Sequence, residues 1–160
     1  MECIVRRAGE SDAEILSLLN ADVQSLHAAA MPTRFKKVES STFSPEAARS
    51  LLADPKRFIF LAIVESEPVG YAYAEVIHQP ESPFTYAWDE VHLHHISVRP
   101  AFRRSGVATA LLDAVHGAAS ELQIDLMTLQ TWTFNEDAQT FFRRNGFTPY
   151  LIRLWNGEMK

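Results

Sequence analysis

A short run of histidines is the part of this 160-residue sequence most suited to chemistry. The stretch "EVHLHHISV" begins at Glu90, and its alternation of apolar and polar residues predicts a strand. His92 and His94 are two residues apart, so they share one face of a regular strand, where Glu90 joins them and from which His95 points away. An imidazole titrates near neutral pH, so the pair could accept a proton from an attacking amine or a relaying water.

A turn with small side chains follows the histidines and runs into an apolar helix. Its residues are Arg103, Arg104, Ser105, Gly106, Val107, Ala108 and Thr109. A helix start exposes main-chain N–H groups and carries the positive end of the helix dipole. Small side chains would let an anion reach these groups, so the turn is predicted to hold a phosphate. Taken alone, Gly106 is equally explained by a tight strand-to-helix turn.

Other phosphate and metal motifs are absent from the sequence. There is no G-x-x-x-x-G-K-[ST] loop, and no G-x-G-x-x-G follows the first strand, which argues against a P-loop or a dinucleotide-binding domain. His92 and His94 could bind a metal, but a third ligand would have to come from Glu90, His78 or elsewhere, and no H-E-x-x-H is present. We therefore expect proton transfer and no metal. Hydrogen-bonded, partly buried histidines are the remaining interpretation.

Composition sets the broad class of the protein. Hydrophobic residues make up 47% and charged residues 22%, as expected for one globular domain over residues 1–160. The net charge of −5 argues against a nucleic-acid partner. No stretch approaches the roughly 20 apolar residues that span a bilayer, so no membrane partner is expected. Cys3 is the only cysteine, and the N-terminal segment does not resemble a signal peptide, which indicates a cytoplasmic protein.

Strands and helices alternate along the rest of the sequence. Strands are predicted at 3–8, 57–64, 71–78, 87–98, 125–134 and 147–155, and helices at 11–29, 44–54, 105–122 and 135–145. Ser11, with Glu14 three residues later, Ser44 and Asn135 are the expected N-caps of three helices, and Gly146 follows the last helix. The order β-α-α-β-β-β-α-β-α-β predicts an α/β fold with a mixed, mostly antiparallel sheet flanked by helices.

Two motifs in the C-terminal half resemble those of the GCN5-related N-acetyltransferase (GNAT) family. The first family signature, Gln or Arg, two residues, Gly, one residue, then Gly or Ala, is matched by Arg103, Gly106 and Ala108. The second, Asn, two residues, Ala, aromatic residues and a Gly-Phe pair, is matched by Asn135, Ala138, Phe141, Phe142, Gly146 and Phe147. The histidine strand also resembles that of arylalkylamine (serotonin) N-acetyltransferases, in which two histidines at the positions of His92 and His94 accept protons.

The resemblance implies a GNAT fold and an N-acetyltransferase that moves acetyl from acetyl-CoA to a primary amine of a small molecule or peptide in a ternary complex. It implies that the main chain of 104–109 holds the pyrophosphate of the coenzyme. Ile96, Ser97 and Val98 would pair with the pantetheine arm, and the Ile96 N–H would polarise the thioester carbonyl. Asn135 would contact the coenzyme. His92 and His94, with Glu90, would remove the amine proton.

Phe142 departs from the family pattern, because many members have at this position a tyrosine that protonates the leaving thiolate. Tyr150, Ser97 or water could replace that tyrosine, or the thiolate could leave unassisted, since a thiol has a pKa of about 8.5. Phe142 itself could line the cofactor site or belong to the helix core. A non-catalytic sensor that binds acyl-CoA is therefore the alternative function.

The acceptor pocket is expected between the first two helices, the loop 32–44 and the loop 78–88. Aromatic residues that could line it are Phe35, Phe84, Tyr86, Trp88, Trp132 and Tyr150. Asp89 and Glu90 would attract a cationic amine. Exposed strand edges and the final "YLIRLW" suggest a homodimer.

Overall fold

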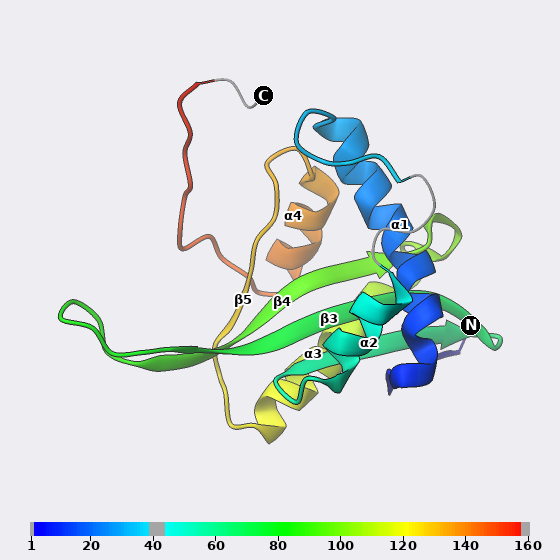
Figure 1. Cartoon of the computed structure of the whole chain (residues 1–160), viewed down its shortest axis with the longest axis horizontal. Helices are drawn as coiled ribbons and strands as arrows, with labels where there is room; N and C mark the ends of the chain where they lie inside the picture. Colours follow the sequence, from blue (N-terminus) through cyan, green and yellow to red (C-terminus); the bar gives the residue numbers. More distant parts are fainter. Residues whose placement is uncertain (1, 39–43, 158–160) are drawn as a thin grey trace.

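Strands and helices alternate through the computed structural model, which describes residues 2–38 and 44–157. The elements are β1 (Cys3–Arg7), α1 (Ala13–Ala30), α2 (Pro45–Ala53), β2 (Arg57–Val64), β3 (Glu67–Gln79), β4 (Trp88–Val98), α3 (Val107–Glu121), β5 (Met127–Leu129) and α4 (Glu136–Arg144). Short 3-10 turns at Glu10–Asp12 and Pro100–Phe102 precede α1 and α3. The predicted α/β class is confirmed (Figure 1).

The five strands form one sheet in the order β1-β2-β3-β4-β5. Neighbours are antiparallel except β4 and β5, which run parallel, so the predicted mixed and mostly antiparallel sheet is confirmed. The parallel pairing joins Val91–Leu93 to Met127–Leu129 and then stops. Beyond it, within the described chain, β4 continues to Val98 paired only with β3. The far half of β4 therefore presents an open edge.

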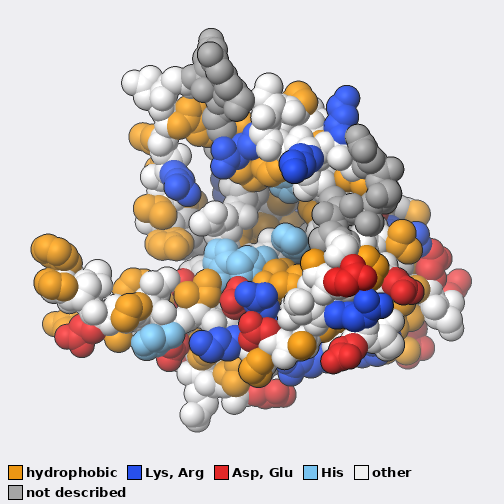
Figure 2. Space-filling view, in the orientation of Figure 1, with side chains coloured by type: hydrophobic (Ala, Val, Ile, Leu, Met, Phe, Trp, Pro, Cys, Tyr) orange, Lys and Arg blue, Asp and Glu red, His pale blue; other side chains and the backbone are white. Residues whose placement is uncertain are grey.

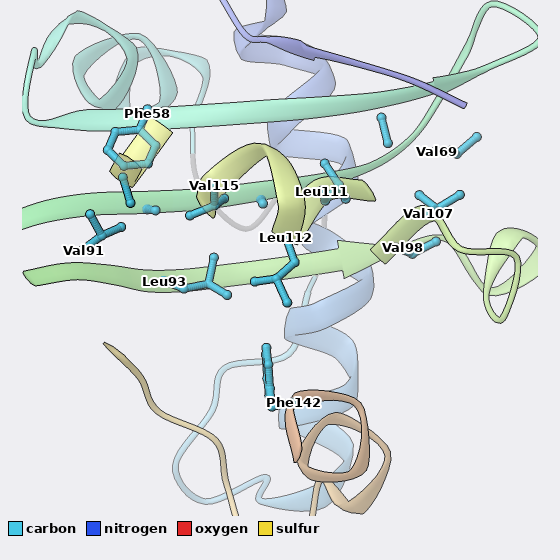
Figure 3. Close-up of a cluster of buried hydrophobic side chains, with 14 of the residues drawn as sticks. Phe58, Val69, Val91, Leu93, Val98, Val107, Leu111, Leu112, Val115 and Phe142 are labelled. Carbon is cyan, nitrogen blue, oxygen red and sulfur yellow. The ribbon is translucent and has the colours of Figure 1, made fainter. Parts of the chain in front are cut away.

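Helices cover both faces of the sheet (Figure 1). Alternation along β3 explains the division, because successive side chains of a strand point to opposite faces. Tyr71 and Tyr73 pack with Leu16 and Leu19 of α1 on one face. On the other face, Ala72 and Ala74 belong to the larger core cluster with α3, which presents apolar residues at helical spacing (Figure 3). These residues of α3 are Val107, Leu111, Leu112 and Val115.

Two of the three predicted N-caps are confirmed, whereas Ser11 lies within the 3-10 turn Glu10–Asp12 and the N-cap residue of α1 is Asp12. The Ser44 side chain accepts a hydrogen bond from the Ala47 N–H at 3.2 Å, and Pro45 occupies the first position of α2. Asn135 Oδ1 accepts from the Ala138 N–H at 3.2 Å, and Gly146, just after α4, has a φ of 86°. None of the described helices has the length and apolarity needed to cross a bilayer.

The predicted strand at 147–155 is wrong. This stretch has no regular secondary structure as far as Trp155, and it runs away from the sheet (Figure 1). Its large side chains are exposed by 61% to 85%: Tyr150, Leu151, Ile152, Leu154 and Trp155. A strand needs a hydrogen-bonded partner, and Pro149 lacks an N–H to donate. The strand predicted at 125–134 is also shortened, to Met127–Leu129.

Candidate active site

A β-bulge in β4 turns three histidines toward the same side of the sheet. Tyr73 pairs with His95, but the next residue of β3, Ala74, pairs with Leu93, so His94 is an extra residue on β4. One extra residue reverses the face on which the following side chains lie. The prediction that His95 points away from His92 and His94 is therefore wrong, and all three line one cavity.

The cavity has a volume of about 330 Å³ and lies between α1, the open half of β4, β5 and the start of α4. Histidine side chains gather beside a hollow near the centre of the face shown in Figure 2. The described lining residues are Asn20, Val23, Gln24, His27, Phe35, His92, Leu93, His94, His95, Ile96, Leu129, Gln130, Thr131, Trp132, Asn135, Ala138 and Phe142. This volume is enough for a small organic molecule.

His92 and His94 are in contact, and each has a polar partner on a neighbouring strand. Their ring centroids are 4.8 Å apart. His94 Nε2 lies 2.9 Å from a carboxylate oxygen of Glu75, and its ring stacks on Tyr73 at 4.7 Å. His92 Nδ1 lies 2.8 Å from the Thr128 hydroxyl. Since Glu75 can only accept, His94 donates through Nε2, and its Nδ1 is left as the basic nitrogen when the ring is neutral.

Partial burial lowers the pKa of His92 below its ordinary value. Proximity to His94 lowers this pKa further, while the charges of Glu90 and Glu75 oppose the shift. His92 is therefore neutral at pH 7 and able to accept a proton, as general-base chemistry requires. The arrangement suits removal of a proton from a group bound in the cavity.

His95 is held by a buried hydrogen-bond network. Its Nδ1 lies 3.0 Å from the Tyr71 hydroxyl, and that hydroxyl accepts a hydrogen bond from Asn20 Nδ2 at 2.6 Å. Burial raises the pKa of Tyr71, so its oxygen keeps its proton and donates it to His95. Burial also lowers the pKa of His95 to about 4. His95 is therefore a neutral ring that carries its proton on Nε2.

The predicted phosphate turn joins the end of β4 to α3. Arg103 Nε donates to the Val98 carbonyl at 3.0 Å, which ties the turn to the strand. Gly106 is the N-cap residue of α3 with a φ of 88°, and no side chain at that position accepts from the first N–H groups of α3. An added Cβ at Gly106 would meet nothing within 4 Å, so the site is open. These N–H groups fit an anion such as a pyrophosphate.

The cofactor residues predicted from the sequence separate into three places. Ile96, Asn135 and Phe142 line the cavity. Ser97 and Val98 are buried on β4 between the cavity and the turn. Arg104, Ser105 and Thr109 are exposed at the turn, whereas Val107 is buried beneath it. The Asn135 side chain also caps α4, and Phe142 packs in the core cluster beside Leu112 (Figure 3).

Glu90 lies outside the cavity that the histidines line. It is buried and lines a second hollow of about 560 Å³, together with Trp88 and Tyr150. Asp89 is exposed and pairs with His78 at 2.7 Å. Neither Asp89 nor Glu90 therefore lines the histidine cavity, and their attraction for a cationic amine stays a prediction. In the part of the chain that is described, no group of three or more His, Cys, Asp or Glu residues could hold a metal ion.

Two of the six aromatic residues predicted to line the acceptor pocket line the histidine cavity. Phe35 and Trp132 line the cavity, with ring centroids 5.3 Å apart. Phe84 and Tyr86 are 94% and 88% exposed in the β3–β4 connection, away from the cavity. Of the predicted loop 32–44, residues 39–43 lie outside the described residues. Loop aromatics carry no periodic signal, so only the folded chain separates the lining residues from the exposed ones.

Sequence reasoning missed several partners of the histidines. Glu75 and Tyr71 share a face of β3 with Tyr73, and this was visible in the alternation of "YAYAE". Asn20 on α1 and Thr128 on β5 had no comparable signal, because their positions depend on how distant elements pack. These four residues set the orientation of the imidazoles.

Comparisons with known proteins give a family and a fold. The model of the family described as "Acetyltransferase (GNAT) family" matches residues 20–147. No curated protein matches the chain significantly. Among solved structures, the tetramutant of BH1408 protein from Bacillus halodurans is 20% identical, with a TM-score of 0.91 and coverage of 97% of this chain and 99% of that one.

Two further solved structures are those of aminoglycoside acetyltransferases. AAC(6')-Iy with the bisubstrate analog CoA-S-monomethyl-acetylneamine is 19% identical, with a TM-score of 0.76 and coverage of 99% of each chain. Meta-AAC0020, from an uncultured soil metagenomic sample and in complex with sisomicin, is 17% identical, with a TM-score of 0.70 and coverage of 98% and 96%. At these identities the likeness establishes the fold alone.

Proposed function

This chain belongs to the GNAT acetyltransferase family, and on that premise we propose that it transfers an acetyl group from acetyl-CoA to a primary amine by direct attack in a ternary complex. One observation carries the proposal. His92 and His94 are hydrogen-bonded to neighbouring strands and line a cavity beside β4. The end of β4 leads to the start of α3, which has no side-chain cap. A base and an anion site are thus placed at the two ends of one open strand edge.

Acetyl-CoA is the co-substrate, and this chain offers main-chain groups to bind it. The amides of 104–109 would hold the pyrophosphate, because Gly106 leaves them open and Arg103 and Arg104 add positive charge. The edge from Ile96 to Val98 would pair with the pantetheine arm, since within the described chain it lacks a β5 partner. The Ile96 N–H would then polarise the thioester carbonyl.

His92 and His94 would accept the proton of the amine. The amine nitrogen attacks the thioester carbon, a C–N bond forms, the C–S bond breaks, and sulfur leaves as a thiolate while the amine proton passes to an imidazole. Glu75, at 2.9 Å from His94 Nε2, would stabilise the imidazolium that results. Glu90, which lines the second hollow, would act through its charge on His92.

The leaving thiolate would depart unassisted or take a proton from water. Phe142 cannot donate a proton, Ser97 is buried, and Tyr150 lines the other hollow. A thiol pKa of about 8.5 makes the thiolate a fair leaving group near neutral pH. Loss of the tyrosine common in the family is therefore compatible with turnover. The homodimer and the cytoplasmic location stay predictions.

Thiol release and thermal unfolding of the whole chain test the function together. We expect acetyl-CoA to raise the melting temperature, and at least one primary amine to drive release of free coenzyme A thiol. The acetylated amine should appear in equal amount by mass spectrometry. A raised melting temperature with no thiol release across a broad amine panel would instead support the non-catalytic sensor. If neither a raised melting temperature nor thiol release were observed, both functions would be refuted.

A further inference from the structure

Four histidines line the cavity, and their hydrogen bonds decide which ring nitrogen each keeps for a ligand. His27 Nδ1 lies 2.7 Å from the Val23 carbonyl, which can only accept, so a neutral His27 donates there and keeps a lone pair on Nε2. A neutral His94 donates to Glu75 and keeps a lone pair on Nδ1. His92 is bonded to a hydroxyl, which allows either tautomer. In His27 and His94 the remaining nitrogen is therefore an acceptor.

His95 differs, because its remaining nitrogen is a donor. Its Nδ1 is flanked by the Tyr71 hydroxyl at 3.0 Å and the Asn20 amide nitrogen at 3.4 Å, and both of these groups have a proton to donate. Nδ1 is therefore the acceptor, and the proton of the neutral ring is on Nε2. In the described parts of the chain, no group accepts a hydrogen bond from Nε2. The Nε2–H of this cavity-lining ring is thus free to donate to a ligand.

Burial keeps His95 in this neutral form. It lowers the pKa of His95 to about 4, and the charges of His94 and His27 act in the same direction. A proton that arrives on His94 during turnover would therefore make protonation of His95 harder still. His95 offers a fixed donor that does not compete with His92 and His94 for the proton of an amine.

Acetyl transfer needs a donor of this kind beside the base. Attack of an amine turns the carbonyl oxygen into an oxyanion, and donors are most effective where that charge develops. In the tetrahedral intermediate the amine nitrogen and the oxyanion are bonded to the same carbon, so an amine next to His94 brings the oxygen close to the neighbours of His94. Both His94 and His95 contact the Tyr73 ring, at centroid distances of 4.7 Å and 5.7 Å. A fixed donor therefore lies on the same part of the cavity wall as the proposed base.

We infer that His95 is a catalytic residue whose Nε2–H donates a hydrogen bond to the acetyl oxygen while the amine attacks. Tyr71 and Asn20 are positioning residues, because they hold the proton of His95 on Nε2. The inference rests on the proposed function and adds a third histidine to the same site, with a role different from that of His92 and His94.

His95 gains and loses no proton in this step. The amine nitrogen forms a bond to the thioester carbon, and the π electrons of the carbonyl move to oxygen, where the Ile96 N–H and the His95 Nε2–H each donate a hydrogen bond. The oxyanion then re-forms the carbonyl, the C–S bond breaks, and sulfur leaves as a thiolate. The amine proton passes to His92 or His94. Loss of His95 should therefore slow the chemical step and leave the binding of both substrates nearly unchanged.

The tautomer of His95 can be measured directly in the unchanged protein. Two-dimensional nitrogen–hydrogen NMR of the whole chain distinguishes a protonated ring nitrogen from an unprotonated one, and the signals are assigned by their absence from His95→Gln. At pH 7 we expect a protonated Nε2 and an unprotonated Nδ1. A neutral ring with its proton on Nδ1 would overturn the inference, because Nε2 would then have nothing to donate.

Removal of the donor gives the kinetic test. With acetyl-CoA and the most active amine of the panel described above, His95→Ala should lower kcat about a hundredfold and change either KM by less than about threefold. His95→Gln keeps an N–H donor and should restore kcat to within about tenfold of the unchanged protein. His116→Ala removes an exposed histidine of the second hollow and is the matched control, with kcat unchanged. Circular dichroism checks that each variant folds.

The outcomes separate the inference from the proposed function. An unchanged kcat in folded His95→Ala, whether or not KM rises, would overturn the inference and leave the proposed function standing. A kcat of His95→Gln as low as that of His95→Ala would also overturn it, since a restored donor would have no effect. If the unchanged protein released no thiol with any amine, the proposed function and the inference would fail together.

Tyr71→Phe tests the positioning role and keeps the inference testable if His95→Ala does not fold. The variant removes the hydroxyl that donates to Nδ1, so part of the His95 population should carry its proton on Nδ1 and kcat should fall about tenfold with little change in KM. Tyr86→Phe, at a side chain that is 88% exposed, is the control. A changed tautomer with an unchanged kcat would overturn the catalytic role of His95, and an unchanged tautomer would overturn the positioning role of Tyr71.

Discussion

Two hollows adjoin β4, and they differ in what their lining can do. The larger, about 560 Å³, is lined by Glu90, Asp125 and Tyr150 and, among the described residues, by a single histidine, His116. The smaller, about 330 Å³, is lined by four histidines, and each has a polar partner. By volume alone, the larger hollow would be the better candidate for the active site. Interconnected basic groups, beside an open strand edge, favour the smaller one.

The largest expected effect is at the glycine turn, where the coenzyme is predicted to bind. Gly106→Glu should weaken acetyl-CoA binding by about a thousandfold, because a carboxylate would lie against the amides meant for a pyrophosphate. Equilibrium binding by calorimetry measures the effect. Gly106→Ala is the matched control, because it places a side chain at the same φ of 88° without a charge, and Gly117→Glu adds the charge on an exposed face of α3. A loss in either control equal to that of Gly106→Glu would mean that a carboxylate beside these amides is not its cause.

The histidine pair gives the next largest effect. His92→Ala combined with His94→Ala should lower turnover about a hundredfold at neutral pH and leave acetyl-CoA affinity nearly intact. In the unchanged protein, kcat/KM should rise with pH through a limb below 6.5, because burial lowers the pKa of His92. The double variant should lose that limb. His78→Ala, an exposed histidine outside the cavity, serves as the control.

The pH dependence of the free energy of unfolding should reveal the titration of His95, the buried imidazole in the smaller cavity. His95 has a pKa of about 4 when folded against an ordinary value of 6.5, so the unfolded chain binds more protons between these values. The contribution of His95 to the free energy of unfolding is therefore complete above pH 6.5 and should fall by about 3 kcal/mol as the pH drops to 4.

Urea unfolding of a variant pair assigns that loss. His95→Gln should flatten the pH dependence between 6.5 and 4, whereas His116→Gln, an exposed histidine of the larger hollow, should leave it unchanged. An identical slope in all three proteins would mean that His95 does not titrate as its burial indicates.

Glu90 gives the smallest effect. Its charge raises the pKa of His92 from the side of the larger hollow, so Glu90→Gln should move the acid limb of kcat/KM to lower pH and change turnover by less than about tenfold. Asp89→Asn, which removes an exposed neighbouring charge, is the control. A loss near that of the histidine variants would mean that Glu90 contacts the substrate, and the separation of the two hollows would fail.

Local signals in the sequence predicted the parts of the fold that depend on neighbouring residues. Ser44 and Asn135 cap their helices because the cap bond spans three residues. Gly106 lies between β4 and α3 and has a positive φ, which favours glycine. The glycine turn accordingly lies at the start of α3 as predicted, and its phosphate-binding role stays a prediction. The strand predicted at 147–155 had suitable residues but lacks a partner among the described strands, and no local pattern reveals that.

By itself, the sequence determined the α/β class, the glycine turn and the presence of His92 and His94 on one strand, because each follows from short-range geometry. Only the tertiary structure decided that His95 joins them, since the bulge opposite Tyr73 arises from pairing with β3. Packing of α1 against the sheet likewise brings Asn20 to the Tyr71–His95 pair, and Glu90 lines the other hollow. Contacts between residues that are distant in the chain leave no recognisable spacing pattern in the sequence.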